Sequence, residues 1–160
     1  MTEPMTQEMY EKLVFLMKGE VNAVKLCIDL IYVCHLWDDL IDRDRDRGPE
    51  DIHKAFRIAF ADMPSNPFYQ AYQQQFSSLM ASAACAYIDS TKLEKGNDDE
   101  KLTAFWIRNA LLSVLHYCMF LVGGPEWVAE NGPEFWRTFG LTNAKYQEFL
   151  EEGKTDEQIS

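Results

Sequence analysis

Residues 21–42 read VNAVKLCIDLIYVCHLWDDLID, and this stretch decides the fold class. Apolar side chains recur at every third or fourth position, which is the spacing of one face of an α-helix. One such face starts with Val24 and Ile28 and ends in acidic residues. The other sides of the helix are apolar too, and a helix that is apolar all round is usually central in its domain. We therefore expect a long central helix over residues 20–45.

The rest of the chain keeps the helical spacing, and no stretch alternates apolar and polar residues over the length of a strand. We predict an all-α fold, a bundle of four principal helices with short C-terminal capping helices. Glycine and proline mark the expected interruptions, at residues 48–49 and in a loop over residues 63–67 (MPSNP). Outside the central helix, the predicted helices cover residues 6–18, 50–61, 68–93 and 99–121.

The C-terminal third begins with two similar sequences, because residues 124–126 and 132–134 both read Gly-Pro-Glu. Proline and glutamate suit the first turn of a helix, so these sequences predict two short capping helices. We assign residues 1–142 to a single helical domain and residues 143–160 to a polar C-terminal helix or tail. Tyr146, Phe149 and Leu150 are spaced as one face of a short helix, and we expect this segment to dock a protein partner.

Composition limits the partners and the compartment. The 160 residues include 15 Lys and Arg against 26 Asp and Glu, a net charge of −11, which disfavours nucleic acid. The longest apolar windows are interrupted by charged and polar residues, so no membrane span is expected. The four cysteines form no CxxC pair, and the first residues are acidic and polar instead of a cationic and apolar export signal. These features predict a cytoplasmic protein.

The acidic end of the central helix is the strongest functional signal. His35, Asp38, Asp39 and Asp42 lie within an arc of roughly 100° around the helix, above the apolar face. Carboxylates this close together must be protonated, paired or bound to a cation, and Mg²⁺ takes oxygen ligands. A simpler interpretation is that the end of the helix is solvated, because the alternating charges of residues 42–47 (DRDRDR) are typical of an exposed helix end.

The sequence Asp38-Asp39-Leu40-Ile41-Asp42 resembles the D-D-x-x-D motif of the trans-isoprenoid synthases, including the squalene and phytoene synthases. In that family the aspartates hold magnesium ions that bind and ionise an allylic diphosphate above an apolar pocket. The resemblance implies a reduced isoprenoid-synthase-like bundle. It also implies that Asp38 and Asp42 are magnesium ligands and that Asp39 is a weaker or outer member of the metal site.

The same family carries a second motif, N-x-x-x-S-x-x-x-E, on a facing helix. The predicted helix over residues 99–121 offers Asn109 and Ser113 at that spacing, with Tyr117 in place of the acid. The resemblance therefore implies a facing wall of Asn109, Ser113 and His116. From the residues alone, His116 could be a core histidine whose polar groups are satisfied, a member of an ion pair or a metal ligand, and a lone histidine on an apolar helix favours the first. Including the basic residues available to a diphosphate, the predicted ligand-binding residues are His35, Arg43, Arg108, Asn109, Ser113 and His116.

Two classes of function follow from these patterns. The first is a magnesium-binding, diphosphate-binding protein, and if it is an enzyme it is a prenyl-diphosphate-type transferase or lyase whose catalytic residues the sequence does not identify. The second is a non-catalytic helical bundle, an adaptor or structural protein, that acts through protein–protein contacts. Serine-hydrolase, P-loop, dinucleotide-binding and HExxH zinc-protease motifs are missing from the sequence.

Overall fold

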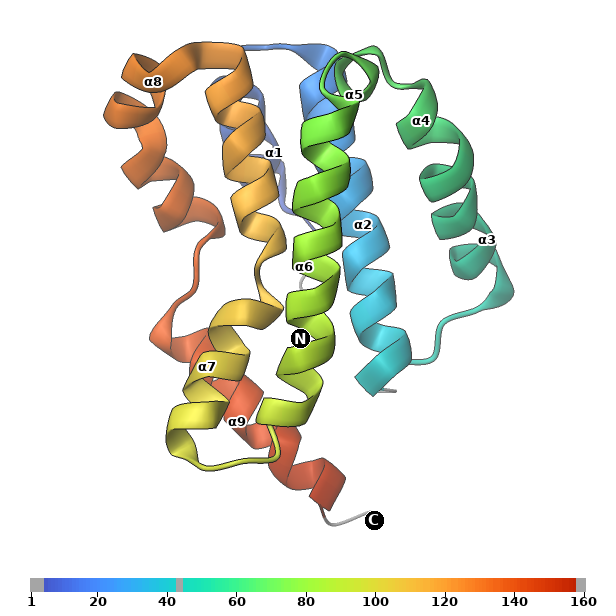
Figure 1. The fold of residues 1–160 in the computed structure, drawn as a ribbon, viewed down its shortest axis with the longest axis vertical. Helices are drawn as coiled ribbons and strands as arrows, with labels where there is room; N and C mark the ends of the chain where they lie inside the picture. The colour runs from blue at the N-terminus through green and yellow to red at the C-terminus, as the bar shows by residue number, and fades with distance from the viewer. Residues whose placement is uncertain (1–4, 43–44, 158–160) are drawn as a thin grey trace. The chain divides into compact units, whose positions relative to one another are not determined.

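The structure, a computed structural model, describes residues 5–42 and 45–157. All the regular secondary structure in these residues is helical, and they contain no strand (Figure 1). The predicted fold class, an all-α helical bundle, is confirmed, although the helices are more numerous than the four principal ones expected. The chain forms two compact units. The N-terminal unit lies within residues 2–73 and 121–123, and the C-terminal unit comprises the described residues after 73 other than 121–123.

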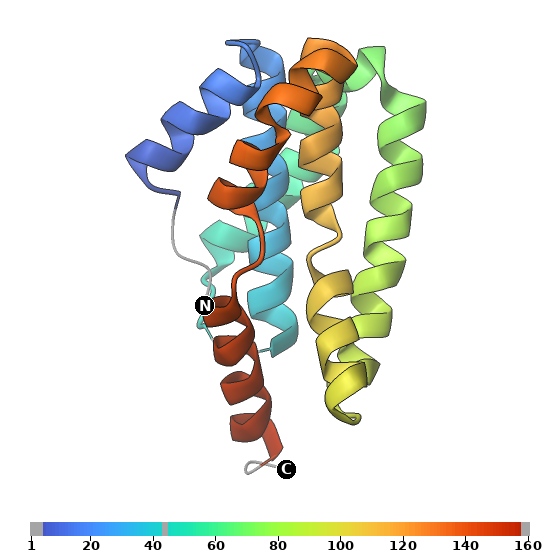
Figure 2. The ribbon, with the colours of Figure 1, turned by 90° about the vertical axis from the view of Figure 1, so that its left-hand side faces the viewer.

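The N-terminal unit begins with α1 (Gln7–Leu16) and α2 (Val21–Asp42). Thr6 caps α1 as predicted, because its Oγ1 accepts a hydrogen bond from the amide of Met9 at 3.2 Å. The chain then turns through Lys18 and Gly19, which both have positive φ angles. Figure 2 shows α1 rising to this corner and α2 descending from it. The corner allows α1 to pack against α2.

Helix α2 contributes much of the buried apolar surface of its unit. Its buried apolar residues are Ala23, Val24, Leu26, Cys27, Leu30 and Leu36. The helix is described as far as Asp42, and Arg45, the predicted last residue, lies in a bend outside it. Next come α3 (Pro49–Arg57), the π-helical turn η1 (Ile58–Asp62), α4 (Met63–Ser65) and α5 (Pro67–Ala71). Both α3 and α5 pack against α2.

The predicted loop over residues 63–67 is wrong. Helical structure continues through Ser65, and Asn66 alone separates α4 from α5. The side chain of Asn66 is buried and satisfied in both directions: Nδ2 donates to the carbonyl of Asn22 at 2.9 Å, and Oδ1 accepts from the amide of Phe68 at 2.8 Å. The second bond caps α5, and the first fixes this break to α2.

The C-terminal unit is built from α6 (Gln73–Leu93), α7 (Asp98–Arg108), α8 (Leu111–Phe139) and α9 (Asn143–Glu157). Asn97 caps α7 in a capping box with Glu100. The predicted helix over residues 99–121 is interrupted at Asn109 and Ala110, which Figure 1 shows as an unwound connection between α7 and α8. Asn109 Nδ2 donates to the carbonyl of Phe105 at 2.9 Å, a local bond that competes with helix continuation.

Helix α8 contains both Gly-Pro pairs of the sequence. At Gly124 the backbone leaves the helical region, with φ 77° and ψ −179°, so the predicted helix start at Pro125 corresponds to a kink. The second predicted start is wrong, because the helix continues through Pro133 to Phe139. Phe135 and Phe139 are buried beyond this proline, and their packing offsets the backbone hydrogen bond that proline cannot donate.

Within the part of the chain that the structure describes, one helical stretch inside Asp98–Glu151 is long and apolar enough, by length and composition alone, to cross a membrane. Of that stretch, 28% is buried. The sequence-based expectation that no segment spans a membrane therefore stays a prediction.

Candidate functional site

The acidic end of α2 places its three aspartates in two different environments. Asp38 and Asp42 are half-buried and lie one turn apart on the same face of the helix. Asp39 is only 2% exposed, although it stands next to Asp38 in the sequence. A carboxylate this deeply buried requires a partner, because burial without one is costly for a charged group.

The partner of Asp39 is Arg47. Arg47 Nε donates to Asp39 Oδ2 at 2.6 Å, and a second guanidinium nitrogen of Arg47 contacts the same oxygen. This hydrogen bonding to Asp39 raises the pKa of the Arg47 guanidinium above its ordinary value. The pair joins the last turns of α2 to the residues that lead into α3.

Arg47 also lies within an extended polar network that connects α2 with the first turn of α3. Its NH1 is 3.9 Å from Asp51 Oδ2, and the hydroxyl of Tyr32 donates to Asp51 Oδ1 at 3.0 Å. Lys54 Nζ lies 3.9 Å from the centre of the Tyr32 ring, a cation–π contact. Burial, followed by the hydrogen bond to Asp51, raises the pKa of Tyr32. Asp39, an acid of the predicted metal site, is thus part of a polar network through its partner Arg47.

His35 lies one turn before Asp38 and is half-buried. Burial lowers the pKa of its imidazole, although Asp38 and Asp39 act in the opposite direction. The neighbouring Cys34 is also affected by burial and by Asp38, which together raise the pKa of its thiol to about 12. At neutral pH the structure therefore favours a neutral imidazole and a protonated thiol beside the acids.

These environments test whether the acids suit a magnesium ion. No group of three His, Cys, Asp or Glu side chains among the described residues is arranged to hold a metal ion. The three aspartates do not fit a common site, because Arg47 binds Asp39. Asp38 and Asp42 fit a different arrangement, since Mg²⁺ in proteins is commonly held by one or two carboxylates together with phosphate oxygens and water.

The remaining predicted ligand-binding residues, apart from Arg43, belong to the C-terminal unit. Arg108 is nearly buried and pairs with Glu94, its NH1 lying 3.0 Å from Glu94 Oε2. Its guanidinium also lies over the rings of Tyr87 and Phe149, with its central carbon 5.3 and 5.8 Å from their centres. Asn109 ends α7. Both side chains are therefore engaged within their own unit.

Ser113 is exposed, whereas His116 packs against aromatic rings of its own unit. The ring centroids of Phe135 and Trp136 lie 5.1 and 5.3 Å from that of His116. These contacts are typical of a core histidine, the second interpretation that the sequence left open. The break at Asn109 also removes the continuous helix on which the predicted spacing with Ser113 depends. That the C-terminal residues face the acidic cluster stays a prediction, and Arg43 lies outside the described residues.

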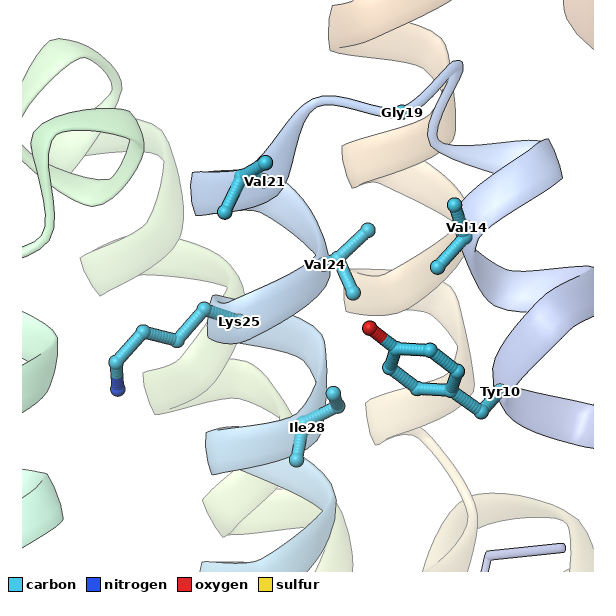
Figure 3. Close-up of a pocket in the computed structure, with 7 residues that line it drawn as sticks. All are labelled: Tyr10, Val14, Gly19, Val21, Val24, Lys25 and Ile28. Carbon is cyan, nitrogen blue, oxygen red and sulfur yellow. The ribbon is translucent and has the colours of Figure 1, made fainter. Parts of the chain in front are cut away.

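An apolar pocket lies beside the other half of α2, between α1 and α2 (Figure 3). Its volume is about 230 Å³, larger than the roughly 150 Å³ cavity that can hold benzene. Val14, Val24 and Ile28 form apolar walls, and the hydroxyl of Tyr10 points toward α2. Lys25 extends away from these side chains and pairs with Asp29 at 2.5 Å. Two residues of the predicted apolar face, Val24 and Ile28, therefore line a cavity.

Sequence reasoning missed Arg47 as the partner of Asp39. The eight-residue separation, with the end of a helix between them, corresponds to no fixed helical spacing. A usable signal was nevertheless present, since an aspartate on an apolar helix requires a cation and Arg47 is the last basic residue before Gly48 and Pro49 stop the helical pattern.

Comparisons with models of known protein families, with curated proteins and with solved structures gave no match. The chemistry of the residues described above is therefore the basis for proposing a function.

Proposed function

We propose that this protein binds a diphosphate group together with Mg²⁺ through Asp38 and Asp42 at the end of α2. The observation that carries the proposal is the placement of these two half-buried carboxylates one turn apart on a single helix face. The resemblance to the D-D-x-x-D motif of the isoprenoid synthases supports the same chemistry. The proposal concerns binding, and it assigns no catalytic residue.

The position of the two carboxylates suits a cation. Both lie toward the C-terminal end of α2, where the helix dipole places negative charge, and the last turn of the described helix contains no basic residue. A bound magnesium ion would neutralise charge on the diphosphate. Asp38 and Asp42 would hold the ion, and His35, which is neutral at pH 7, would offer a hydrogen bond to the bound group.

The ligand we envisage also has an apolar part. The pocket beside Val24 and Ile28 is on the same helix as the two carboxylates. Val24 and Asp38 are 14 positions apart, which corresponds to about 21 Å along a helix. A short diphosphate ester bound at the two carboxylates therefore cannot also reach the pocket. Its hydrocarbon would contact the apolar face of α2 that lies between the pocket and the carboxylates.

The test is isothermal titration calorimetry of the protein with MgCl₂, with inorganic diphosphate, and with both. We expect heat of binding for the combination and a weak response to either component alone. The variant Asp38→Asn/Asp42→Asn should lose this response. A matched control is Glu126→Gln/Glu130→Gln, which removes two exposed carboxylates at the same helical spacing and should bind as the parent does. Equal binding by all three proteins, or binding by none, would contradict the proposal.

A second candidate function, a non-catalytic helical protein acting through protein–protein contacts, is favoured by one surface feature. Phe56 and Phe60 are 56% and 74% exposed, and their ring centroids lie 5.5 Å apart. Ala55 and Ile58, on the opposite side of the same helical segment, are buried. Adjacent exposed aromatic side chains are characteristic of protein-binding surfaces.

A docking surface should be dispensable for folding. We expect Phe56→Ser/Phe60→Ser to leave the urea midpoint of unfolding nearly unchanged, because surface substitutions usually alter stability by less than about 0.5 kcal/mol. Phe76→Ser is the contrasting variant, since Phe76 is fully buried, and it should be strongly destabilised. A large loss of stability in the double variant would show that the two rings serve the fold.

A further inference from the structure

We infer that Arg47 takes the place of a metal ion at Asp39, so that the second aspartate of the D-D-x-x-D sequence serves the junction between α2 and α3. This inference goes beyond the proposed function, because it holds whether or not Asp38 and Asp42 bind magnesium. It rests on the ion pair and its surroundings.

The ion pair between Asp39 and Arg47 is largely buried. Asp39 is 2% exposed, and the Arg47 side chain is 23% exposed. Two guanidinium nitrogens contact the same carboxylate oxygen, and one of these contacts is a hydrogen bond of 2.6 Å. Such a charge-assisted contact stabilises a buried carboxylate, and here the cation is a guanidinium group. A metal ion could reach Asp39 only if Arg47 were displaced.

Arg47 is itself anchored at the start of α3. It immediately precedes Gly48, the N-cap of α3, and Pro49, the first residue of that helix. Asp51, in the first turn of α3, is 3.9 Å from Arg47 and accepts the hydrogen bond from Tyr32. Tyr32 belongs to α2. The guanidinium is therefore held between a carboxylate of α2 and a carboxylate of α3, and displacing it would also disturb the packing of these helices.

Arg47 also places a positive charge beside a cluster of three aspartates. Asp38, Asp39 and Asp42 lie within five residues of the same helix, and neighbouring negative charges repel one another. Arg47 supplies one positive charge directly to the most buried of the three. If Arg47 were replaced by an uncharged residue, Asp39 would be left as a buried and unpaired carboxylate, which a divalent cation could then neutralise.

A double-mutant cycle tests the inference. The variants are Arg47→Met, Asp39→Asn and the combination of both, and the measurement is urea unfolding in EDTA and in MgCl₂ without diphosphate. In EDTA we expect Arg47→Met to lower the folding equilibrium constant about a hundredfold or more, as is typical when one member of a buried ion pair is removed. The folding equilibrium constant of the combined variant should be at least about tenfold higher than the product of the two single fold-losses predicts.

Magnesium provides the second measurement. MgCl₂ should restore part of the stability of Arg47→Met, and it should restore less in the combined variant, which lacks the Asp39 carboxylate. Additive losses, or the same magnesium response in both variants, would overturn the inference. If Arg47→Met does not fold in EDTA, the inference requires that the combined variant still folds. A combined variant that also fails to fold would overturn the inference.

The cycle separates this inference from the proposed function. Asp39→Asn should bind magnesium with diphosphate as tightly as the parent, within about twofold, because Asp39 is outside the proposed ligand pair. A loss of binding in a folded Asp39→Asn protein would show that Asp39 is a ligand and would overturn the inference. If the parent binds no magnesium with diphosphate, only the proposed function fails, and the unfolding cycle still tests the role of Arg47.

Discussion

His116 is a residue whose interpretation changes once its neighbours in the structure are known. In the sequence it accompanies Asn109 and Ser113 as a predicted ligand-binding residue. In the structure it lies against the rings of Phe135 and Trp136. Burial lowers the pKa of its imidazole below the ordinary value of 6.5, because the charged form loses hydration. The neutral imidazole is therefore the folded form at pH 7.

This pKa predicts a stability effect with a definite sign. Below pH 6.5 the unfolded chain takes up a proton at His116 that the folded chain resists, so the contribution is complete above pH 6.5 and is lost as the pH falls. We expect the melting temperature of the parent to fall more between pH 7.5 and pH 5.5 than that of His116→Phe. Circular dichroism checks this, and His35 acts as a constant background in both proteins. Equal pH dependence would contradict the assignment.

The cysteines give a second prediction at the scale of the residue. The pKa of the Cys34 thiol is raised to about 12, so almost no thiolate is present at pH 8, whereas Cys85 is exposed. Cys27 and Cys118 are buried. We expect iodoacetamide to modify Cys85 first in the native protein, and peptide mass spectrometry would locate the label. Earlier modification of Cys34 would mean that its surroundings differ from those described.

At the scale of the element, the corner between α1 and α2 carries backbone strain. Lys18 has a φ of 52° and Gly19 a φ of 71°, so two successive residues adopt the left-handed conformation. Glycine adopts this conformation without penalty, whereas a residue with a Cβ pays roughly 1–2 kcal/mol. Lys18 therefore stores strain in the turn that brings α1 against α2.

Replacing Lys18 should relieve that strain. We expect Lys18→Gly to raise the free energy of unfolding by about 0.5–1 kcal/mol, since the greater freedom of glycine in the unfolded chain offsets part of the gain. The matched control is Gly19→Ala, whose Cβ would meet no atom within 4 Å, so that its expected loss of about 1–2 kcal/mol is purely conformational. Urea unfolding measures both. A destabilised Lys18→Gly would show that the side chain matters more than the backbone.

For the whole molecule, charge is the dominant global property. With 26 acidic and 15 basic residues the chain carries a net charge of −11, and self-repulsion of this kind destabilises a compact state. Added salt shortens the range of the repulsion, with a Debye length of about 10 Å at 0.1 M.

We therefore expect the melting temperature to rise when NaCl is increased from about 20 mM to about 200 mM. The control variant Glu126→Gln/Glu130→Gln, which removes two exposed negative charges, should respond less. Differential scanning calorimetry gives both values. A melting temperature that falls with salt would show that attraction between exposed opposite charges outweighs the overall repulsion.

The sequence by itself determined the features that depend on neighbouring residues. The all-α fold, the cap at Thr6 and the interruption near Gly48 follow from helical spacing and from local backbone preferences. The common face of Asp38 and Asp42 also follows, because residues four positions apart on a helix are neighbours. These rules act within one or two helical turns, so they can be applied without knowledge of the fold.

Only the tertiary structure decided which residues each polar side chain contacts and whether a helix continues through a proline. The ion pair between Asp39 and Arg47 joins the end of one helix to the residues before the next. The continuation of α8 through Pro133 and the aromatic surroundings of His116 depend on which apolar side chains are buried together. The physical reason is that the free energy of each of these arrangements depends on burial and on ion pairing between residues of separate turns and helices. Such contacts follow no fixed spacing along the chain.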